Sequence, residues 1–370
     1  MKLLVMGNNG HLGGLSVHYT TLVKYLQKAD FQIMCININD TNDKIFNNKS
    51  IEEISIPYKP TTIIDKVKKV LKLAGAGRRA KAFAPDVFIA TGLGYGYALI
   101  ASKLPKSTFK IFEEVHFEAT ADKLRLKMVN DFDAVAVQTK GMIKPFTLNV
   151  STSKPVDFLP CFSKEYEADS YKAIPALDEG IRIAYFGRLA WNKGLKDFIK
   201  ATAAVFKTNQ HITLNIYGGG PEAKSIQQEI DDQGLNNQIF LKGFYSDAEF
   251  PDLISNHHGV IIPSIATEGL PLALIESMRF GRPVFATTIG AMPEVGETNK
   301  EGLFISEIDK DSLHSNFSSF IDMINGNKFS AQYINNIYEE NYSNLAFNRT
   351  WLKMLSDPKG YFSASKSTVS

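Results

Sequence analysis

The sequence predicts an α/β protein with two Rossmann-like domains, each built around a parallel β-sheet. Short apolar runs alternate with stretches of helical spacing along most of the 370 residues, which is typical of parallel α/β units. The alternation stops between Pro155 and Gly180, in a stretch rich in proline and charge, and then begins again. A chain of this length also exceeds the usual size of one hydrophobic core. We therefore expect two domains joined by a linker.

The predicted elements follow from this pattern. In the first domain, the expected strands are Lys2–Met6, Phe31–Ile38, Asp86–Thr91, Phe109–Val115 and Ala134–Gln138. In the second domain, they are Ile181–Phe186, Ile212–Tyr217, Ile239–Lys242, Gly259–Ile262 and Pro283–Ala286. The expected divisions are an N-terminal domain (1–160), a linker (161–180), a C-terminal domain (181–342), a final helix (343–357) and a disordered Ser-rich tail (358–370).

Composition limits the classes of function. Hydrophobic content of 44% and charged content of 22% are those of an ordinary globular protein, and a net charge of +2 gives no reason to expect a nucleic-acid partner. The two cysteines, Cys35 and Cys161, are far apart and lack metal-ligand spacing, which suits a reducing cytoplasm. The apolar run at the N-terminus is too short for a signal peptide or a membrane span.

Glycine-rich turns follow two of the predicted strands. Gly7, Gly10, Gly13 and Gly14 stand between the first strand and a helix, where backbone N–H groups can approach a phosphate closely. Their spacing is not that of the dinucleotide fingerprint, and a tight turn without a ligand explains them equally well. In the second domain, Gly218–Gly220 turn sharply after a strand, before Pro221 starts a helix.

Two cations occupy the corresponding place after the first strand of the second domain. Arg188 follows that strand directly, and Lys193 stands at the predicted start of the next helix. Because the carboxyl ends of parallel strands line the ligand crevice of such folds, both side chains are expected there. An arginine fork and a compact ammonium together suit a diphosphate.

Two glutamates flank a Gly-Leu-Pro break further along the chain. Pro271 suits the first turn of a helix, so Glu268 is expected in a loop and Glu276 on that helix. Carboxylates so placed could accept hydrogen bonds from two hydroxyl clusters of one ligand, such as a ribose and a hexose. The alternative is a solvated loop acid and an acid near a helix start, where the helix dipole favours negative charge.

These motifs together resemble a known enzyme family. The segments FGRLAWNKG, YGGGPE, LKGF and PSIATEGLPLALIESMRFGRPVFATTIGAMPEV look like the signature set of the retaining nucleotide-sugar glycosyltransferases of family four (glycosyltransferase group 1). The likeness covers most of residues 181–305, and extends more loosely to HLGGLSVHY and EEVHFE. It implies a GT-B fold, with two Rossmann-like domains facing across an interdomain cleft and the C-terminal helix returning to the N-terminal domain.

The resemblance also implies roles for individual residues. Arg188 and Lys193 would hold the donor diphosphate, Glu276 would bind the ribose, and Glu268 would face the transferred sugar. The catalytic set would be Glu268, His116, Arg188 and Lys193, with His116 reaching the donor sugar. The donor site would be completed by Gly13 and Gly14 at the diphosphate, Gly243 and Phe244 around the nucleobase, Gly269 and Leu270 beside Glu268, and Gly219 in the turn after the second strand of the C-terminal domain.

The chain departs from the family pattern at two points. Three residues, 265–267, separate Pro-Ser from Glu-Gly where two are common, which leaves the shape of that loop open. Gly290 is followed by Ala291 where a second glycine is frequent, and we expect no loss of activity from the added methyl group.

The implied activity is a metal-independent transfer that needs no cofactor. The donor would be a UDP-sugar first, with GDP- and ADP-sugars open, and a hexose or N-acetylhexosamine would pass to a glycan or lipid-linked acceptor in bacterial surface polysaccharide synthesis. The Asp-x-Asp sequence at residues 309–311 is better explained as a helix N-cap. The alternatives are a nucleotide-sugar-binding protein without transfer activity and a GT-B sugar-nucleotide epimerase; a dinucleotide oxidoreductase would leave both glutamates without a task.

A basic amphipathic segment lies in the N-terminal domain, within residues 61–83. The apolar residues that share one helical face are Ile63, Val67, Val70, Leu71 and Ala74. Seven cations lie between Lys66 and Lys81, eight with Lys59, and Asp65 is the only nearby acid. Such a helix would suit peripheral contact with the anionic inner face of the cytoplasmic membrane. A helix that covers the sheet with this apolar face is an equally good explanation.

Overall fold

The computed structural model divides into two compact units. Unit 1 contains Met1–Lys164 and Phe347–Ser370, and unit 2 contains Glu165–Ala346. The predicted linker, 161–180, is therefore shared, since its first four residues belong to unit 1 and the rest to unit 2. The structure describes residues 1–8, 14–39, 45–46, 51–57, 62–92, 94–114, 126, 129–150, 152–166, 171–266 and 268–364.

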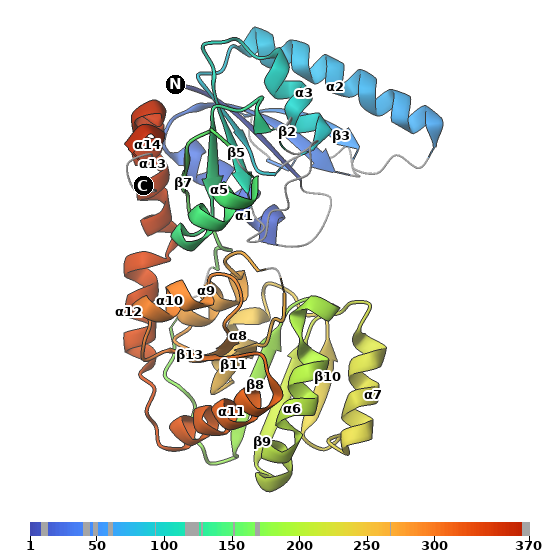
Figure 1. Cartoon of the computed structure of the whole chain (residues 1–370), viewed down its shortest axis with the longest axis vertical. Helices are drawn as coiled ribbons and strands as arrows, with labels where there is room; N and C mark the ends of the chain where they lie inside the picture. The colour runs from blue at the N-terminus through green and yellow to red at the C-terminus, as the bar shows by residue number, and fades with distance from the viewer. Residues whose placement is uncertain are drawn as a thin grey trace. The chain divides into compact units, whose positions relative to one another are not determined.

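Unit 1 is built on a seven-stranded parallel sheet in the order β3-β2-β1-β4-β5-β6-β7 (Figure 1). Its strands are β1 (Lys2–Asn8), β2 (Gln32–Asn39), β3 (Ile51–Pro57), β4 (Val87–Ala90), β5 (Phe109–Glu114), β6 (Ala134–Val137) and β7 (Val156–Phe158). The five predicted strands are all present. The two edge strands were missed, because β3 is half polar and β7 has only three residues.

Helices cover both faces of this sheet. They are α1 (Gly14–Lys28), α2 (Ile63–Phe83), α3 (Tyr95–Lys103) and α5 (Ile143–Val150), together with the 3₁₀ turn η1 (Lys140–Met142). Apolar side chains of the sheet, such as Phe88 and Phe112, stack with Phe132 in the core. The sheet is buried because its strands carry near-continuous apolar runs.

The C-terminal residues belong to the same unit. Helix α13 (Asn344–Ser356) carries Trp351, which is fully buried and donates its indole N–H to the Pro160 carbonyl at 2.9 Å. The prediction of a disordered tail is wrong for residues 358–364, which form helix α14 (Pro358–Ala364). Phe362 is buried there, and the Tyr361 hydroxyl donates to the Phe158 carbonyl at 2.7 Å. Two aromatic residues thus order a stretch whose serines suggested disorder.

Unit 2 is built on a six-stranded parallel sheet in the order β10-β9-β8-β11-β12-β13. The strands are β8 (Ile181–Phe186), β9 (Ile212–Tyr217), β10 (Ile239–Gly243), β11 (Gly259–Ile262), β12 (Val284–Thr287) and β13 (Leu303–Ser306). The helices are α6 (Leu195–Thr208), α7 (Ala223–Gln233), α8 (Phe250–Ser255), α9 (Leu272–Arg279), α10 (Met292–Thr298), α11 (Lys310–Asn325) and α12 (Ala331–Asn341). The five predicted strands are confirmed, and the edge strand β13 was missed.

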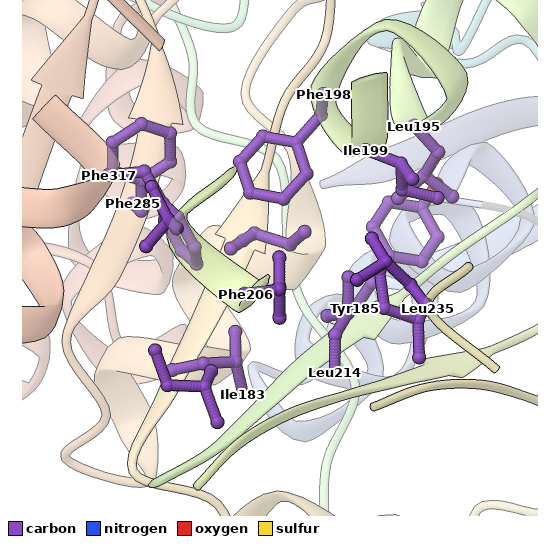
Figure 2. Packing of buried hydrophobic residues seen from close by; sticks show 14 of the residues in the cluster. Ile183, Tyr185, Leu195, Phe198, Ile199, Phe206, Leu214, Leu235, Phe285 and Phe317 are labelled. Carbon is purple, nitrogen blue, oxygen red and sulfur yellow. The ribbon is translucent and has the colours of Figure 1, made fainter. Parts of the chain in front are cut away.

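The core of unit 2 lies between the sheet and helices α6 and α11. Phe198 of α6 meets Phe317 of α11 edge to face, with ring centroids 5.0 Å apart, and Phe285 of β12 packs against Phe317 at 5.5 Å (Figure 2). Aromatic pairs of this geometry add to the free energy gained by burying their area. This core fixes the positions of the strand ends, and therefore of the loops that follow them.

Candidate functional site

Three loops at the carboxyl ends of β8, β9 and β10 are joined by backbone hydrogen bonds. The Gly187 amide donates to the Tyr217 carbonyl at 3.0 Å, and the Leu189 amide donates to the Gly219 carbonyl at 2.9 Å. The Gly218 amide donates to the Gly243 carbonyl at 2.7 Å. Since these bonds satisfy loop backbone groups, the loops form one continuous surface at this edge of the sheet.

Glycine is required in this surface at Gly218, and Gly219 lies beside an aromatic ring. Gly218 has φ +131°, and a Cβ there would lie 1.9 Å from the Gly187 carbonyl oxygen. A Cβ on Gly219 would lie 2.3 Å from a ring carbon of Phe244. The Phe244 ring therefore lies against the Gly219 backbone, yet the residue is 87% exposed. An exposed aromatic face beside bare backbone is a suitable platform for a planar base.

The turn that carries Lys193 is fixed to the loop after β11. Lys193 ends the 3₁₀ turn η2 (Trp191–Lys193), so it lies just before α6 rather than at the helix start as predicted. The Ile265 amide donates to the Asn192 carbonyl at 3.0 Å. Gly194 has φ +67°, and a Cβ there would lie 2.0 Å from the Pro263 carbonyl oxygen. Two motifs that are distant in the sequence are thus adjacent in space.

This adjacency brings Lys193 against Glu268. The Lys193 ammonium forms an ion pair with the Glu268 carboxylate, which also accepts a hydrogen bond from the Ser264 hydroxyl at 2.7 Å. Glu268 is only 8% exposed, so its charge needs these partners. The sequence placed Lys193 at a diphosphate and Glu268 at a sugar without predicting that they touch. An ammonium has three donors, so this contact leaves Lys193 capacity for a second anion.

Arg188 lies just after the carboxyl end of β8, in the first of the three loops. Its side chain is exposed, and its carbonyl accepts a hydrogen bond from the Tyr185 hydroxyl at 2.9 Å. Burial raises the pKa of Tyr185, the Glu268 carboxylate raises it further, and the Arg188 guanidinium opposes both. The Tyr185 hydroxyl therefore interacts electrostatically with both Glu268 and Arg188, so these two charged residues lie near the same tyrosine of unit 2.

Glu276 lies on α9, as predicted, and has a partner that the sequence did not suggest. The Tyr166 hydroxyl donates to the Glu276 carboxylate at 2.9 Å. The Tyr166 ring stacks on Phe250 with centroids 5.3 Å apart, and the Arg279 guanidinium lies 5.3 Å from its centre. Burial raises the pKa of Tyr166, and the neighbouring Glu276 raises it further. Burial followed by Glu276 likewise raises the pKa of Tyr245, which places Glu276 near the loop after β10.

Tyr166 and Ser264 are the residues that sequence reasoning missed. Tyr166 falls in the predicted linker, where no periodicity marks it. Ser264 stands four residues before Glu268 in a loop, and loop spacing does not show which side chains meet. The aromatic character of Tyr166 within a charged stretch was the one available signal.

The loop around Glu268 is also held by the segment after β12. Gly290 has φ +67°, and a Cβ there would lie 2.3 Å from the Glu268 carbonyl oxygen. The Ala291 amide donates to the Gly269 carbonyl at 3.2 Å, and its methyl group is buried, so the position accommodates alanine. Leu270 is also buried. Gly290 is thus the glycine that this contact requires, while Thr267 lies outside the described residues.

The candidate residues of unit 1 are only partly described. Gly13 and His116 lie outside the described residues, and Gly14 is the exposed first residue of α1. Asp309 caps α11 by accepting a hydrogen bond from the Ser312 amide at 2.9 Å, which confirms the N-cap prediction. Across the ranges that the structure describes, no group of three or more His, Cys, Asp or Glu side chains is arranged to hold a metal ion.

The fold and the site together define a class of protein. Carboxylates, cations, glycine turns and an exposed aromatic ring meet at the carboxyl ends of parallel strands, which is where nucleotides bind in doubly wound α/β folds. Residues 168–340 match the family described as glycosyl transferases group 1, so this part of the chain is a group 1 glycosyltransferase domain.

Relatives and solved structures agree with this family. The chain is 28% identical over 129 residues to an alpha-D-kanosaminyltransferase of Streptomyces kanamyceticus, covering 35% of this chain and 33% of the relative. It is 25% identical over 261 residues to the amylovoran biosynthesis glycosyltransferase AmsK of Erwinia amylovora, covering 66% and 63%. The chain therefore spans between one third and just under two thirds of the length of these relatives.

The structural comparison extends over both units. The crystal structure of HepE from Anabaena in complex with UDP is similar, with a TM-score of 0.76 and 17% identity, covering 96% of this chain and all of that one. This similarity shows the GT-B fold.

Proposed function

We propose that this chain is a retaining, metal-independent glycosyltransferase. It moves a hexose or N-acetylhexosamine from a nucleoside-diphosphate sugar to a glycan or lipid-linked acceptor in bacterial surface polysaccharide synthesis. The observation that carries the proposal is the convergence of Lys193, Glu268 and Arg188 around the end of β8, with Glu276 on the helix that follows Glu268. The likeness to AmsK, named for amylovoran biosynthesis, supports the polysaccharide context.

The donor is assigned from the chemistry of these side chains. A carboxylate such as Glu276 can accept hydrogen bonds from both ribose hydroxyls, and the exposed Phe244 ring offers a stacking face to the base. Arg188 and Lys193 provide the cations for a diphosphate. The similar HepE structure is a complex with UDP, which supports UDP-sugars as the first donors to test before GDP- and ADP-sugars.

The reaction follows from where charge develops. The bond between the anomeric carbon and the diphosphate oxygen breaks, and the acceptor oxygen forms a bond to that carbon on the same face. The acceptor proton passes to the departing diphosphate, whose growing negative charge is stabilised by Arg188 and Lys193. Ser264 and Lys193 hold the Glu268 carboxylate in place to face the transferred sugar.

We also propose that the reaction takes place in the cytoplasm. Cys35 and Cys161 are both free and buried, which suits a reducing compartment. A nucleotide-sugar-binding protein and an epimerase would keep the same donor site, so activity must be separated from binding.

The release of nucleoside diphosphate tests the proposed activity. Purified protein is incubated with UDP-glucose or UDP-N-acetylglucosamine, with and without a panel of oligosaccharide and lipid-linked sugar acceptors. We expect release only when an acceptor is added, and we expect the same rate in the presence of EDTA. Donor binding without release under any acceptor would support a binding protein, and conversion of the sugar without acceptor would support an epimerase. The anomeric configuration of the product tests retention.

A further inference from the structure

The N-terminal half of α2 is not packed on the sheet of unit 1. The buried residues of this 21-residue helix are Leu73, Ala76, Gly77 and Ala80, all in its second half. The stretch from Ile63 to Lys72 is described throughout and contains no buried side chain. Figure 1 shows this end of α2 extending past the edge strand β3. Because the capping box of Thr62 and Asp65 is complete, the extension is a well-formed helix end.

The N-terminal half of α2 carries a stripe of large apolar side chains that are exposed. Its members, from 54% exposed for Val67 to 79% exposed for Ile63, are Ile63, Ile64, Val67, Val70 and Leu71. The structure therefore excludes the alternative that these residues cover the sheet, since the helix contacts β3, β2 and α3 through other positions. A contiguous exposed apolar stripe of this kind marks an interaction surface.

The charges around the stripe indicate what it meets. At helical spacing, Lys66 and Lys68 lie on either side of the stripe. The whole helix has seven cations and one acid, a formal charge of +6, whereas the complete chain has a net charge of +2. A second copy of this helix packed against the first would place these cations against one another. An anionic bilayer, which is apolar beneath a layer of negatively charged headgroups, would match both the apolar stripe and the cations beside it.

A basic groove adjoins the second half of the helix. It has a volume of about 440 Å³ and lies between β3 and α2, with Ile54 and Ser55 on one side and Lys72, Arg78 and Arg79 on the other. Arg79 also forms an ion pair with Glu52 of β3, which fixes this part of the helix to the sheet edge. The groove extends the cationic surface from the stripe toward the sheet, at a size that suits a phosphate-bearing headgroup.

We propose that α2 docks unit 1 on a bilayer that contains anionic lipids. The stripe from Ile63 to Leu71 enters the boundary between headgroups and acyl chains, Lys66 and Lys68 contact lipid phosphates beside it, and the groove accepts a headgroup. Within the described residues, no helix is both long and apolar enough to span a bilayer. This inference concerns unit 1 and goes beyond the transfer reaction proposed for unit 2, where it would supply a membrane-borne acceptor.

Vesicle binding of the full chain tests the proposal without any nucleotide sugar. Vesicles of phosphatidylcholine with 30% phosphatidylglycerol, roughly the range in which basic helices respond to surface charge, are compared with pure phosphatidylcholine at low and high salt. We expect binding to the anionic vesicles at low salt, weakened by salt, and little binding to the neutral ones. The double variant V67D/L71D is expected to bind at least about tenfold more weakly, because two apolar anchors become charged.

Matched variants separate the surface from general effects. Lys66→Gln with Lys68→Gln should weaken binding about 25-fold, at roughly fivefold for each cation near the membrane. Leu345→Asp changes an equally exposed leucine outside α2, and Lys200→Gln with Lys207→Gln removes two exposed cations of α6. Both controls should bind as the wild type does. Thermal unfolding checks that every variant is folded.

Three outcomes would overturn the proposal. The first is a wild-type chain that fails to bind anionic vesicles at low salt. The second is a V67D/L71D chain that binds as tightly as the wild type. The third is a wild-type dimer, seen by sedimentation, that V67D/L71D converts to a monomer, since the stripe would then be covered by a second copy. Donor binding is measured separately by thermal shift, so a failure here leaves the proposed transfer reaction untouched.

Discussion

Helices α2 and α6 each follow a strand of the parallel sheet of their unit, but they differ in where their large apolar residues lie. In α6, the apolar residues Leu195, Phe198, Ile199 and Phe206 are buried against the sheet of unit 2 (Figure 2). In α2, the large apolar residues of the first half, Ile63 to Leu71, point to solvent, and the buried residues Leu73, Ala76 and Ala80 follow them. Periodicity therefore identifies an apolar face, but it does not tell what that face meets.

The difference lies in how much of each helix is buried. The buried residues of α2 begin at Leu73, so the large apolar residues before it remain exposed. In α6, large residues from end to end require the whole helix to lie on the sheet. A helix half whose large apolar residues all lie outside the core is a candidate for contact with another surface.

The largest expected effect concerns the difference in burial between Phe198 of α6 and Leu71 of α2. Phe198→Ala in α6 should lower the free energy of unfolding by about 3 to 5 kcal/mol, because it removes a fully buried ring. Leu71→Ala in α2 should change it by no more than about 0.5 kcal/mol, because that side chain is 65% exposed. Urea unfolding of both variants gives the answer, and a similar loss in the two would show that Leu71 is part of a core.

The next largest effect concerns the turn that leads into α6. Lys193→Ala should cost about 2 to 4 kcal/mol of transition-state stabilisation, roughly 30- to 900-fold in kcat/KM, because the ammonium opposes the charge of the leaving diphosphate. Lys196→Ala, at an exposed position of α6, is the control and should transfer at the wild-type rate. Equal rates in the two variants would show that Lys193 has no role in the transfer reaction.

The next prediction concerns the pH dependence of stability that a buried histidine of unit 2, His257, should cause. Burial lowers the pKa of His257 from 6.5 to about 4, and Arg182 and His258 also oppose its charge. Its Nδ1 lies 2.6 Å from the Leu253 carbonyl, and Nε2 lies 3.0 Å from the Asn215 amide nitrogen. The neutral ring is therefore the form that fits. Because the folded pKa is below the unfolded one, this stability is present above pH 6.5 and is lost as pH falls toward 4.

The size of this effect follows from the two pKa values. Between pH 7 and pH 5, about 2 kcal/mol of the free energy of unfolding should be lost through His257. His257→Gln should be less sensitive to this change of pH than the wild type, which urea titrations at both pH values measure. The comparison of the two chains cancels other titrating groups, and an identical pH dependence in both would contradict the assignment.

The smallest expected effect concerns Tyr166. Removing its hydroxyl in Tyr166→Phe should raise the KM for the donor about fivefold, near 1 kcal/mol, and leave kcat unchanged, because Glu276 loses the bond that orients it toward a ribose. Tyr333→Phe, on α12, should have no effect. A fall in kcat at constant KM would assign Tyr166 a different role.

Much of unit 2 could be predicted because its signals are local. Strong apolar runs marked its inner strands, and Arg188, Lys193, Glu268 and Glu276 stand in short motifs at the ends of strands and the starts of helices. The structure confirms that Glu268 lies in a loop and Glu276 on a helix. Edge strands such as β13 escaped because short, partly exposed strands carry weak periodicity.

The rest could not be predicted because it depends on contacts between distant residues. The pairing of Lys193 with Glu268 arises from backbone contacts between the η2 turn and the loop after β11, which no local pattern encodes. Tyr166 reaches Glu276 across 110 residues of sequence. The order of α14 depends on where Phe362 finds a buried site. In each case, the fold had to be known before the contact could be inferred.

Donor binding at Glu276 tests the central claim most directly. Thermal unfolding is followed with UDP, GDP and ADP for the wild type, Glu276→Ala and the control Glu297→Ala, whose side chain is exposed on α10. At least one nucleoside diphosphate should raise the Tm of the wild type and the control, since a ligand at a hundred times its Kd adds about 2.7 kcal/mol. The rise should shrink in Glu276→Ala. No rise with any of the three at millimolar concentration, or an undiminished rise in Glu276→Ala, would contradict the account.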